Sequence, residues 1–160
     1  LVDIQAGAIH RTWSTPQETV HMVAVTLDGK HAAASSGADG MVVFLDLRAD
    51  ASTLPMPIRL GAGVAGLAVH PLTGDAWVAN QSTNNLSIVS RKTGEVLATH
   101  DTGVVPFRVA FTADVDLSIT RGEFVAIVDL ESGDLIDRID ARKGPDGIAY
   151  ARPRDVATKR

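Results

Sequence analysis

Short apolar runs alternate with short polar turns along most of the chain. In residues 66–103, four runs (LAV, WVAN, LSIVS and EVLATH) are separated by turns rich in Gly, Pro, Asn and Asp. Apolar or β-branched runs of this length, bounded by such turns, predict β-strands. No stretch keeps an apolar period of about 3.6 residues over a helical length, so we expect almost no helix. This stretch therefore predicts a small antiparallel sheet of four strands.

The same unit recurs along the whole sequence. An alanine between large apolar residues appears at Ala24, Ala68, Ala110 and Ala149, with spacings of 44, 42 and 39 residues. An Asp or Ser in the third run of each unit keeps a similar period, with spacings of 43, 44 and 39 residues. A period of about 40–45 residues with four strands per repeat is typical of a β-propeller blade. We therefore predict an all-β chain, a β-propeller built of four-stranded antiparallel blades.

The second blade resembles a known repeat family. The strand Ala76–Asn80, then Asn85–Val89, then Thr93–Thr99 are similar to the YVTN family of propeller repeats, with Trp77 at the position of the family tyrosine. The first blade is closer to the WD40 pattern, with Leu45-Asp46 where Trp-Asp would stand. The resemblance covers nearly all of the chain. It implies the architecture and no particular function, because this superfamily carries out many.

The repeats predict a single module over residues 1–160. Three complete blades are expected at about residues 20–61, 64–103 and 106–143, and residues 144–160 together with 1–14 would form a split blade. Unpaired strand edges favour completion of the split blade. It could close within one chain as a ring of four blades, or between two chains as a ring of eight. The third alternative, which we favour because family members typically have seven or eight blades, is a segment of a larger propeller.

Composition and charge narrow the function only slightly. The 160 residues are 45% hydrophobic with a mean hydropathy of +0.11, which is typical of a globular domain. A net charge of −4 gives no reason to expect nucleic-acid binding. No apolar run approaches the roughly 18 residues of a membrane span. The absence of cysteine excludes disulfides and thiolate metal sites.

Candidate functional residues lie in the loops that enter the first strand of each blade and those that join its second and third strands. Propellers bind ligands with these loops, and positions that differ between repeats are not explained by blade packing. These positions are His21, Asn84, Arg108, Arg121, Glu123 and Asp146. For each of them, an exposed loop residue without a function is the simpler interpretation.

Short motifs for metals, nucleotides and catalysis are missing. The five histidines show no HxH or HExxH spacing, so we predict no metal and no cofactor, although a metal site assembled across blades stays open. Residues 61–66 spell GxGxxG, but a dinucleotide site requires a helix after the glycines, and an alternating strand is expected there. We interpret this segment as a link between blades.

The sequence thus favours a binding scaffold whose partner is a protein, a peptide or a small ligand on the loop face. The alternative is an enzyme with its site at the channel mouth, because similar propellers include lactone hydrolases and subunits of periplasmic redox enzymes. In that case His21, Glu123 and Asp146 would be acid/base or metal candidates, and Arg108 would bind an anionic group. The resemblance also favours a periplasmic or cell-surface location. Further partners would be a second copy, as in a homodimer, or the remaining blades of the same protein.

Overall fold

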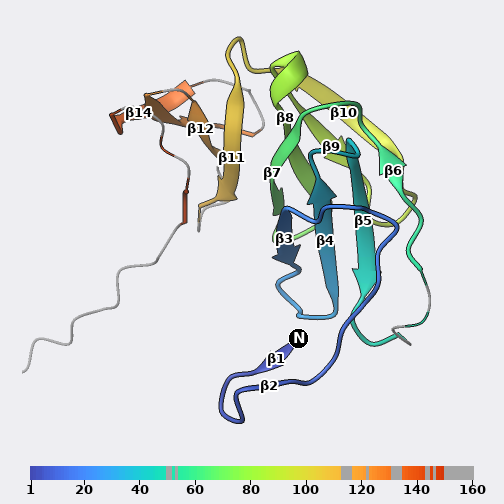
Figure 1. The fold of residues 1–160 in the computed structure, drawn as a ribbon. Coiled ribbons are helices and arrows are strands. Elements are labelled where there is room, and N and C mark those ends of the chain that lie inside the picture. Colours follow the sequence, from blue (N-terminus) through green and yellow to red (C-terminus); the bar gives the residue numbers. More distant parts are fainter. Residues whose placement is uncertain are drawn as a thin grey trace, which may run out of the picture.

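The computed structural model describes residues 1–49, 52, 54–112, 117–121, 123–130, 135–142, 145 and 147–149. Within these residues the chain forms three four-stranded antiparallel sheets and one two-stranded sheet (Figure 1). The only helical element described is a single 3₁₀ turn, η1 (Gln81–Thr83). The prediction of an all-β chain of four-stranded blades is confirmed. No described helix is long and apolar enough to cross a membrane.

Each sheet is a meander in which neighbouring strands follow one another along the chain. The first blade contains β3 (Met22–Val25), β4 (His31–Ser36), β5 (Met41–Asp46) and β6 (Ile58–Arg59). The second blade contains β7 (Val64–Val69), β8 (Ala76–Asn80), β9 (Asn85–Val89) and β10 (Val96–Asp101). The third blade contains β11 (Pro106–Phe111), β12 (Leu117–Arg121), β13 (Phe124–Val128) and β14 (Leu135–Asp140).

The N-terminal hairpin of β1 (Val2–Asp3) and β2 (Ala8–Ile9) provides two paired strands, as expected for the third and fourth strands of a split blade. Ile148 and Ala149, predicted in the first strand of that blade, are in no strand. Residues 150–160, which include the predicted second strand, lie outside the described residues. The split blade itself stays a prediction.

Two apolar clusters hold the blades together. Between the first and second blades, Ala33 and Val42 pack with Leu67, Val78 and Val89. Between the second and third blades, the cluster combines side chains from both sheets: Ala68, Trp77, Ala79, Leu86, Val109 and Ile119. β7 and β8 contribute to both clusters, because successive side chains of a strand point to opposite faces. The second blade is thus covered on both faces.

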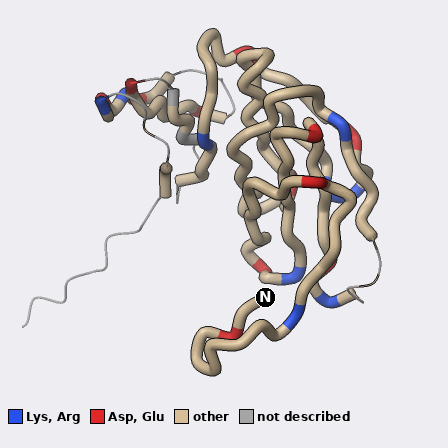
Figure 2. The backbone as a smooth tube through the Cα atoms, viewed as in Figure 1, with Lys and Arg blue, Asp and Glu red and all other residues tan. Residues whose placement is uncertain are grey.

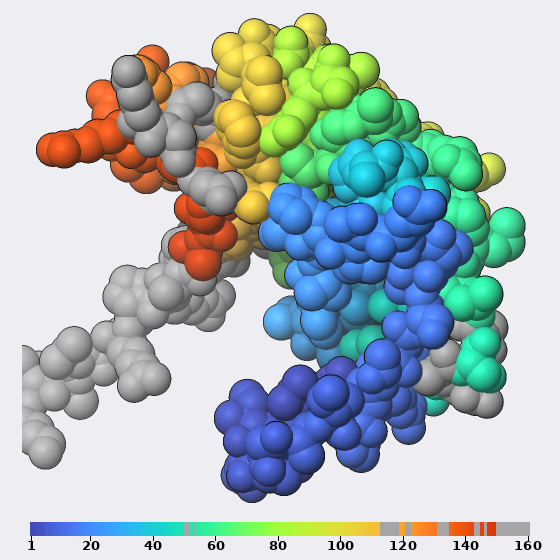
Figure 3. Space-filling view, in the orientation of Figure 1, coloured from blue at the N-terminus to red at the C-terminus, as the bar shows by residue number. Residues whose placement is uncertain are grey.

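The sheets of the first and third blades are less covered than the sheet of the second blade. Figure 3 shows the third blade and the N-terminal hairpin at separate ends, with the first and second blades between them. On β3, Met22 and Ala24 pack toward the second blade, while Val23 and Val25 point outward and are 62% and 54% exposed. Every residue of β14 is exposed. Apolar sheet surface thus remains open on both terminal blades.

The segment at Gly61–Gly63 is a turn between β6 and β7, not the start of a helix. Gly61 and Gly63 have φ of +99° and +80°, and strand β7 begins directly afterwards at Val64. A backbone that enters a strand presents no helix N-terminus to a pyrophosphate. The interpretation of the GxGxxG motif as a link between blades is confirmed.

Candidate functional site

The turns of the blades gather at two opposite faces. The loop face carries the segments that enter β3, β7 and β11 and the turns β4–β5, β8–β9 and β12–β13; η1 lies on this face, at the top of Figure 1. The opposite face carries the β3–β4 and β7–β8 turns and the β5–β6 and β9–β10 turns. Charged residues of both signs are interspersed over the chain rather than gathered at one place (Figure 2).

Two of the predicted site residues are exposed on the loop face. His21 precedes β3, and its N–H donates to the Ser35 carbonyl at 2.9 Å, which leaves the imidazole exposed. Glu123 lies in the β12–β13 turn, where its carbonyl accepts the Ala141 N–H at 2.9 Å and its side chain is exposed. Arg121 ends β12, but its side chain lies outside the described part, and Asp146 is outside it altogether.

Two other predicted residues have structural roles. Asn84 is left-handed, with φ of 53°, and its carbonyl accepts both the N–H and the hydroxyl of Thr102 at 2.9 and 2.6 Å. Arg108 lies on β11 against Gly66 of β7: a Cβ on Gly66 would be 2.7 Å from Arg108 Cα and 3.2 Å from its Cδ. Asparagine tolerates the left-handed conformation that such turns require. Turn geometry and blade packing therefore account for part of what distinguishes these two positions.

Asp39 is a loop-face residue that the sequence did not single out. In the β4–β5 turn its carboxylate accepts the Ser36 hydroxyl and, at 2.9 Å, the N–H of Glu18. The Ser36 hydrogen bond is the main cause that lowers the pKa of Asp39 below its ordinary value. Beside it, the buried Gln17 donates to the carbonyls of Ala34 and Met41. These bonds fix the segment that enters β3 onto the first blade.

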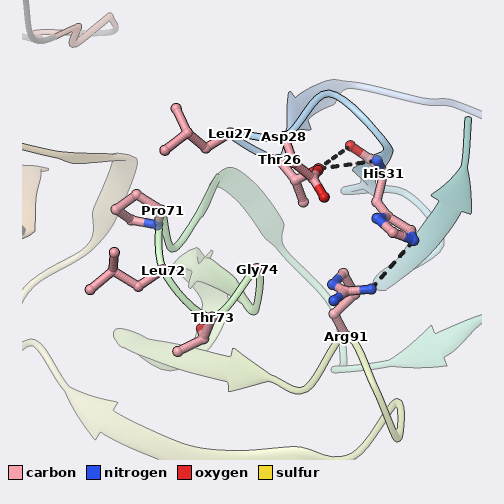
Figure 4. Close-up of a pocket in the computed structure, with 9 residues that line it drawn as sticks. All are labelled: Thr26, Leu27, Asp28, His31, Pro71, Leu72, Thr73, Gly74 and Arg91. Atoms are coloured by element: carbon pink, nitrogen blue, oxygen red, sulfur yellow. Dashed lines mark hydrogen bonds between the residues drawn. The ribbon is translucent and has the colours of Figure 1, made fainter.

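A pocket of about 280 Å³ lies on the opposite face, between the first and second blades (Figure 4). Thr26, Leu27, Asp28 and His31 line it from the first blade, and residues 71–74 and Arg91 line it from the second. Sequence reasoning missed this pocket. Its residues are ordinary turn residues within each repeat, and only the packing of two blades brings them together.

No metal centre is found among the residues that the structure describes. They contain no group of three or more His, Asp or Glu side chains placed to hold an ion. His31 instead contacts arginine side chains, and His70 uses Nδ1 to accept the N–H groups of Leu72 and Thr73, both at 3.2 Å. These two histidines serve packing and turns.

Solved structures with a similar arrangement of blades settle the architecture. Hydrazine synthase from Kuenenia stuttgartiensis superposes with a TM-score of 0.71 at 16% identity, over 88% of this chain and 41% of that one. Virginiamycin B lyase from Staphylococcus aureus superposes with a TM-score of 0.70 at 13% identity, over 94% of this chain and 52% of that one. The chain is a β-propeller. It spans about half the length of these two propeller chains.

At such low sequence identity, the similarity to these proteins shows the fold alone. No protein-family model and no curated protein matches the sequence. The conclusion about function has to come from the sites of the propeller itself.

Proposed function

We propose that the chain is a propeller module of the YVTN type that acts as a binding scaffold, with the loop face receiving a protein, a peptide or a small ligand. The observation that carries this proposal is the contrast between the loops and the blades beneath them. His21 and Glu123 are exposed on different blades of one face, while the strands below are packed and the entering segment is fixed through Asp39. A rigid support with chemically different loops is the usual arrangement of a recognition surface.

The enzyme alternative receives less support. It requires polar side chains that converge within hydrogen-bond reach. Here His21 belongs to the first blade and Glu123 to the third, with the second blade packed between these two. Hydrazine synthase and virginiamycin B lyase are both named as enzymes, but a likeness at 16% and 13% identity carries no activity over to this chain.

Two further parts of the proposal concern context. The YVTN resemblance favours the periplasm or the cell surface. The open sheet surfaces on β3 and β14 favour completion by more blades, either of the same protein or of a second copy in a homodimer.

Site-specific photo-crosslinking tests the scaffold in the cells that produce the protein. A photoreactive residue is placed at His21 or Glu123 on the loop face and, as a matched control, at the exposed Lys92 in the β9–β10 turn of the opposite face. We expect a discrete adduct from the loop-face positions only, and its loss in a variant with alanine at the other loop-face position. Equal adducts from both faces, or none from the loop face, would contradict the proposal.

A further inference from the structure

Arg91 crosses from the second blade to the first. It begins the β9–β10 turn, where its N–H donates to Asp75 Oδ1 at 3.0 Å, and its Nη1 lies 3.4 Å from His31 Nε2 on the first blade. Gly74, with φ of +77°, makes room for this side chain, since a Cβ there would be 2.8 Å from Arg91 Nε. The guanidinium is thus held in place by the protein itself, which lowers the entropic cost of binding a ligand.

The charge of Arg91 is not neutralised within the described residues. Arg48 nearby pairs with Asp46 through two contacts of 2.9 and 3.0 Å, whereas no described carboxylate forms an ion pair with Arg91. Its buried Nε also has no acceptor there. A guanidinium carries five N–H donors and no acceptor, so Arg91 keeps donors for an oxyanion.

His31 holds Arg91 in position from the first blade. Its Nε2 faces two guanidinium groups, at 3.4 Å from Arg91 Nη1 and 3.5 Å from Arg48 Nη2. Because guanidinium groups only donate, Nε2 is the acceptor in these two contacts. Arg91 is the one arginine or lysine among the described residues that line the pocket.

The turn beside Arg91 adds no anion-binding backbone groups. The N–H groups of Leu72 and Thr73 already donate to His70 Nδ1, and that of Asp75 donates to Thr73 Oγ1. Phosphate sites gather several free backbone N–H groups or a helix N-terminus. A single guanidinium instead matches one carboxylate through two parallel hydrogen bonds.

Asp28 lies on the other side of the pocket (Figure 4). Its Oδ1 accepts the Thr26 hydroxyl at 2.6 Å and the Lys30 N–H at 3.0 Å, and the Thr26 bond is the main cause that lowers the pKa of this carboxyl. Oδ2 accepts no hydrogen bond from the described residues. A charged Asp28 repels a multiply charged anion but accepts a bond from a hydroxyl or an ammonium group.

We propose that this pocket binds a small monocarboxylate that also carries a hydroxyl or ammonium group, with the carboxylate on Arg91 and the donor on Asp28. A volume of about 280 Å³ suits a compact molecule of this class. The exposed side chains of Leu27 and Leu72 provide apolar walls. The site is on the face opposite the proposed recognition surface and does not depend on it.

An NMR titration of the Arg91 Nε–H resonance tests this site on the whole chain. The probes are glycolate and glycine, which carry the second group, and acetate and inorganic phosphate, which do not match both side chains. We expect saturable shifts with glycolate or glycine, weaker binding of acetate, and no saturation with phosphate. The glycolate and glycine arms show whether the second group is a hydroxyl or an ammonium.

Three variants separate recognition from general charge effects. Arg91→Gln should weaken glycolate or glycine binding by about tenfold or more, because a charged hydrogen-bonded pair is lost. Lys92→Gln removes the same charge from the next residue, which does not line the pocket, and should leave binding unchanged. Asp28→Asn should tighten acetate binding and reduce the preference for the two-group probes.

Several results would overturn the proposal. These are shifts matched by sodium chloride at the same ionic strength, equal weakening by Arg91→Gln and Lys92→Gln, or saturable binding of phosphate in preference to the carboxylates. An unchanged ranking of probes in Asp28→Asn also overturns it. If Arg91→Gln fails to fold, the wild-type titration and Asp28→Asn still decide the outcome.

Discussion

At the scale of single residues, aspartate side chains stabilise several of the turns by accepting hydrogen bonds. Asp28, Asp39 and Asp46 each accept hydrogen bonds from their own turn, and in each the pKa is lowered, first by a side-chain hydrogen bond from Thr26, Ser36 or Arg48. A carboxyl whose pKa is lowered by folding stabilises the folded state above its ordinary pKa of about 3.9. That contribution is lost as the pH falls through the lowered pKa.

Asp39→Asn tests this contribution. We expect lower stability than the wild type at neutral pH, because the charged acceptor for Ser36 and Glu18 is lost. The two proteins should converge as the pH falls through the lowered pKa of Asp39, because the wild-type carboxyl is then protonated too. Urea unfolding over a series of pH values from neutral to acidic measures the difference. Glu123→Gln is the control, since the Glu123 side chain makes no hydrogen bond with described residues and the variant removes a negative charge without removing such a bond. A constant deficit for Asp39→Asn at every pH would contradict the linkage.

At the scale of elements, the close approach of neighbouring blades depends on glycine. Gly66 on β7 faces β11 so closely that a Cβ would lie 2.5 Å from the Phe107 carbonyl oxygen. The register of β7 against β8 also shifts between Val64 and Leu67, around this residue. A side chain here would push two strands apart rather than displace a flexible side chain.

Gly66→Ala should therefore destabilise the fold by about 2 kcal/mol, because overpacking against backbone cannot relax by a rotamer change. Gly147→Ala is the matched control: no described atom lies within 4 Å of the position that its methyl group would take, and its backbone is not left-handed, so little change is expected. Thermal and urea unfolding compare the two variants. Equal stability of both would show that the blades separate more easily than their packing suggests.

The strands could be predicted from the sequence because each strand is an apolar run bounded by turn residues, and both signals are local. The four runs of residues 66–103 correspond to β7 to β10. The site could be predicted less well. The role of Asn84 follows from the geometry of its turn. The contact of Arg108 with Gly66 follows from the packing of two blades. The Arg91–His31 contact joins residues that are 60 positions apart in the sequence. No local sequence pattern predicts a contact between residues so far apart in the chain.

At the scale of the whole molecule, the first and third blades both expose apolar side chains. The outward β3 side chains Val23 and Val25 are β-branched, as in the buried strands, yet they are 62% and 54% exposed. Leu135, Ile136 and Ile139 on β14 are also exposed. Exposed apolar sheet surface of this kind supports the proposed completion by further blades.

The isolated chain should accordingly associate in solution. We expect a concentration-dependent increase in mass by sedimentation velocity, and a shift toward monomer when Val23 and Val25 are both replaced by lysine, because two charges cannot be buried unpaired in an interface. Unfolding of the monomeric variant should remain cooperative. A wild-type chain that stays monomeric at every concentration, with the double variant indistinguishable from it, would contradict the prediction.

The coverage of the second blade on both faces has a further consequence for how the molecule opens. Local unfolding begins where few apolar contacts must be broken, so the terminal blades open first and the central sheet last. β7 and β8 contribute to both apolar clusters, so we expect their amides to exchange more slowly than those of the other described strands. The pocket between the first and second blades has one wall in this unit and the other in a blade that opens earlier, so its shape depends on the first blade remaining docked.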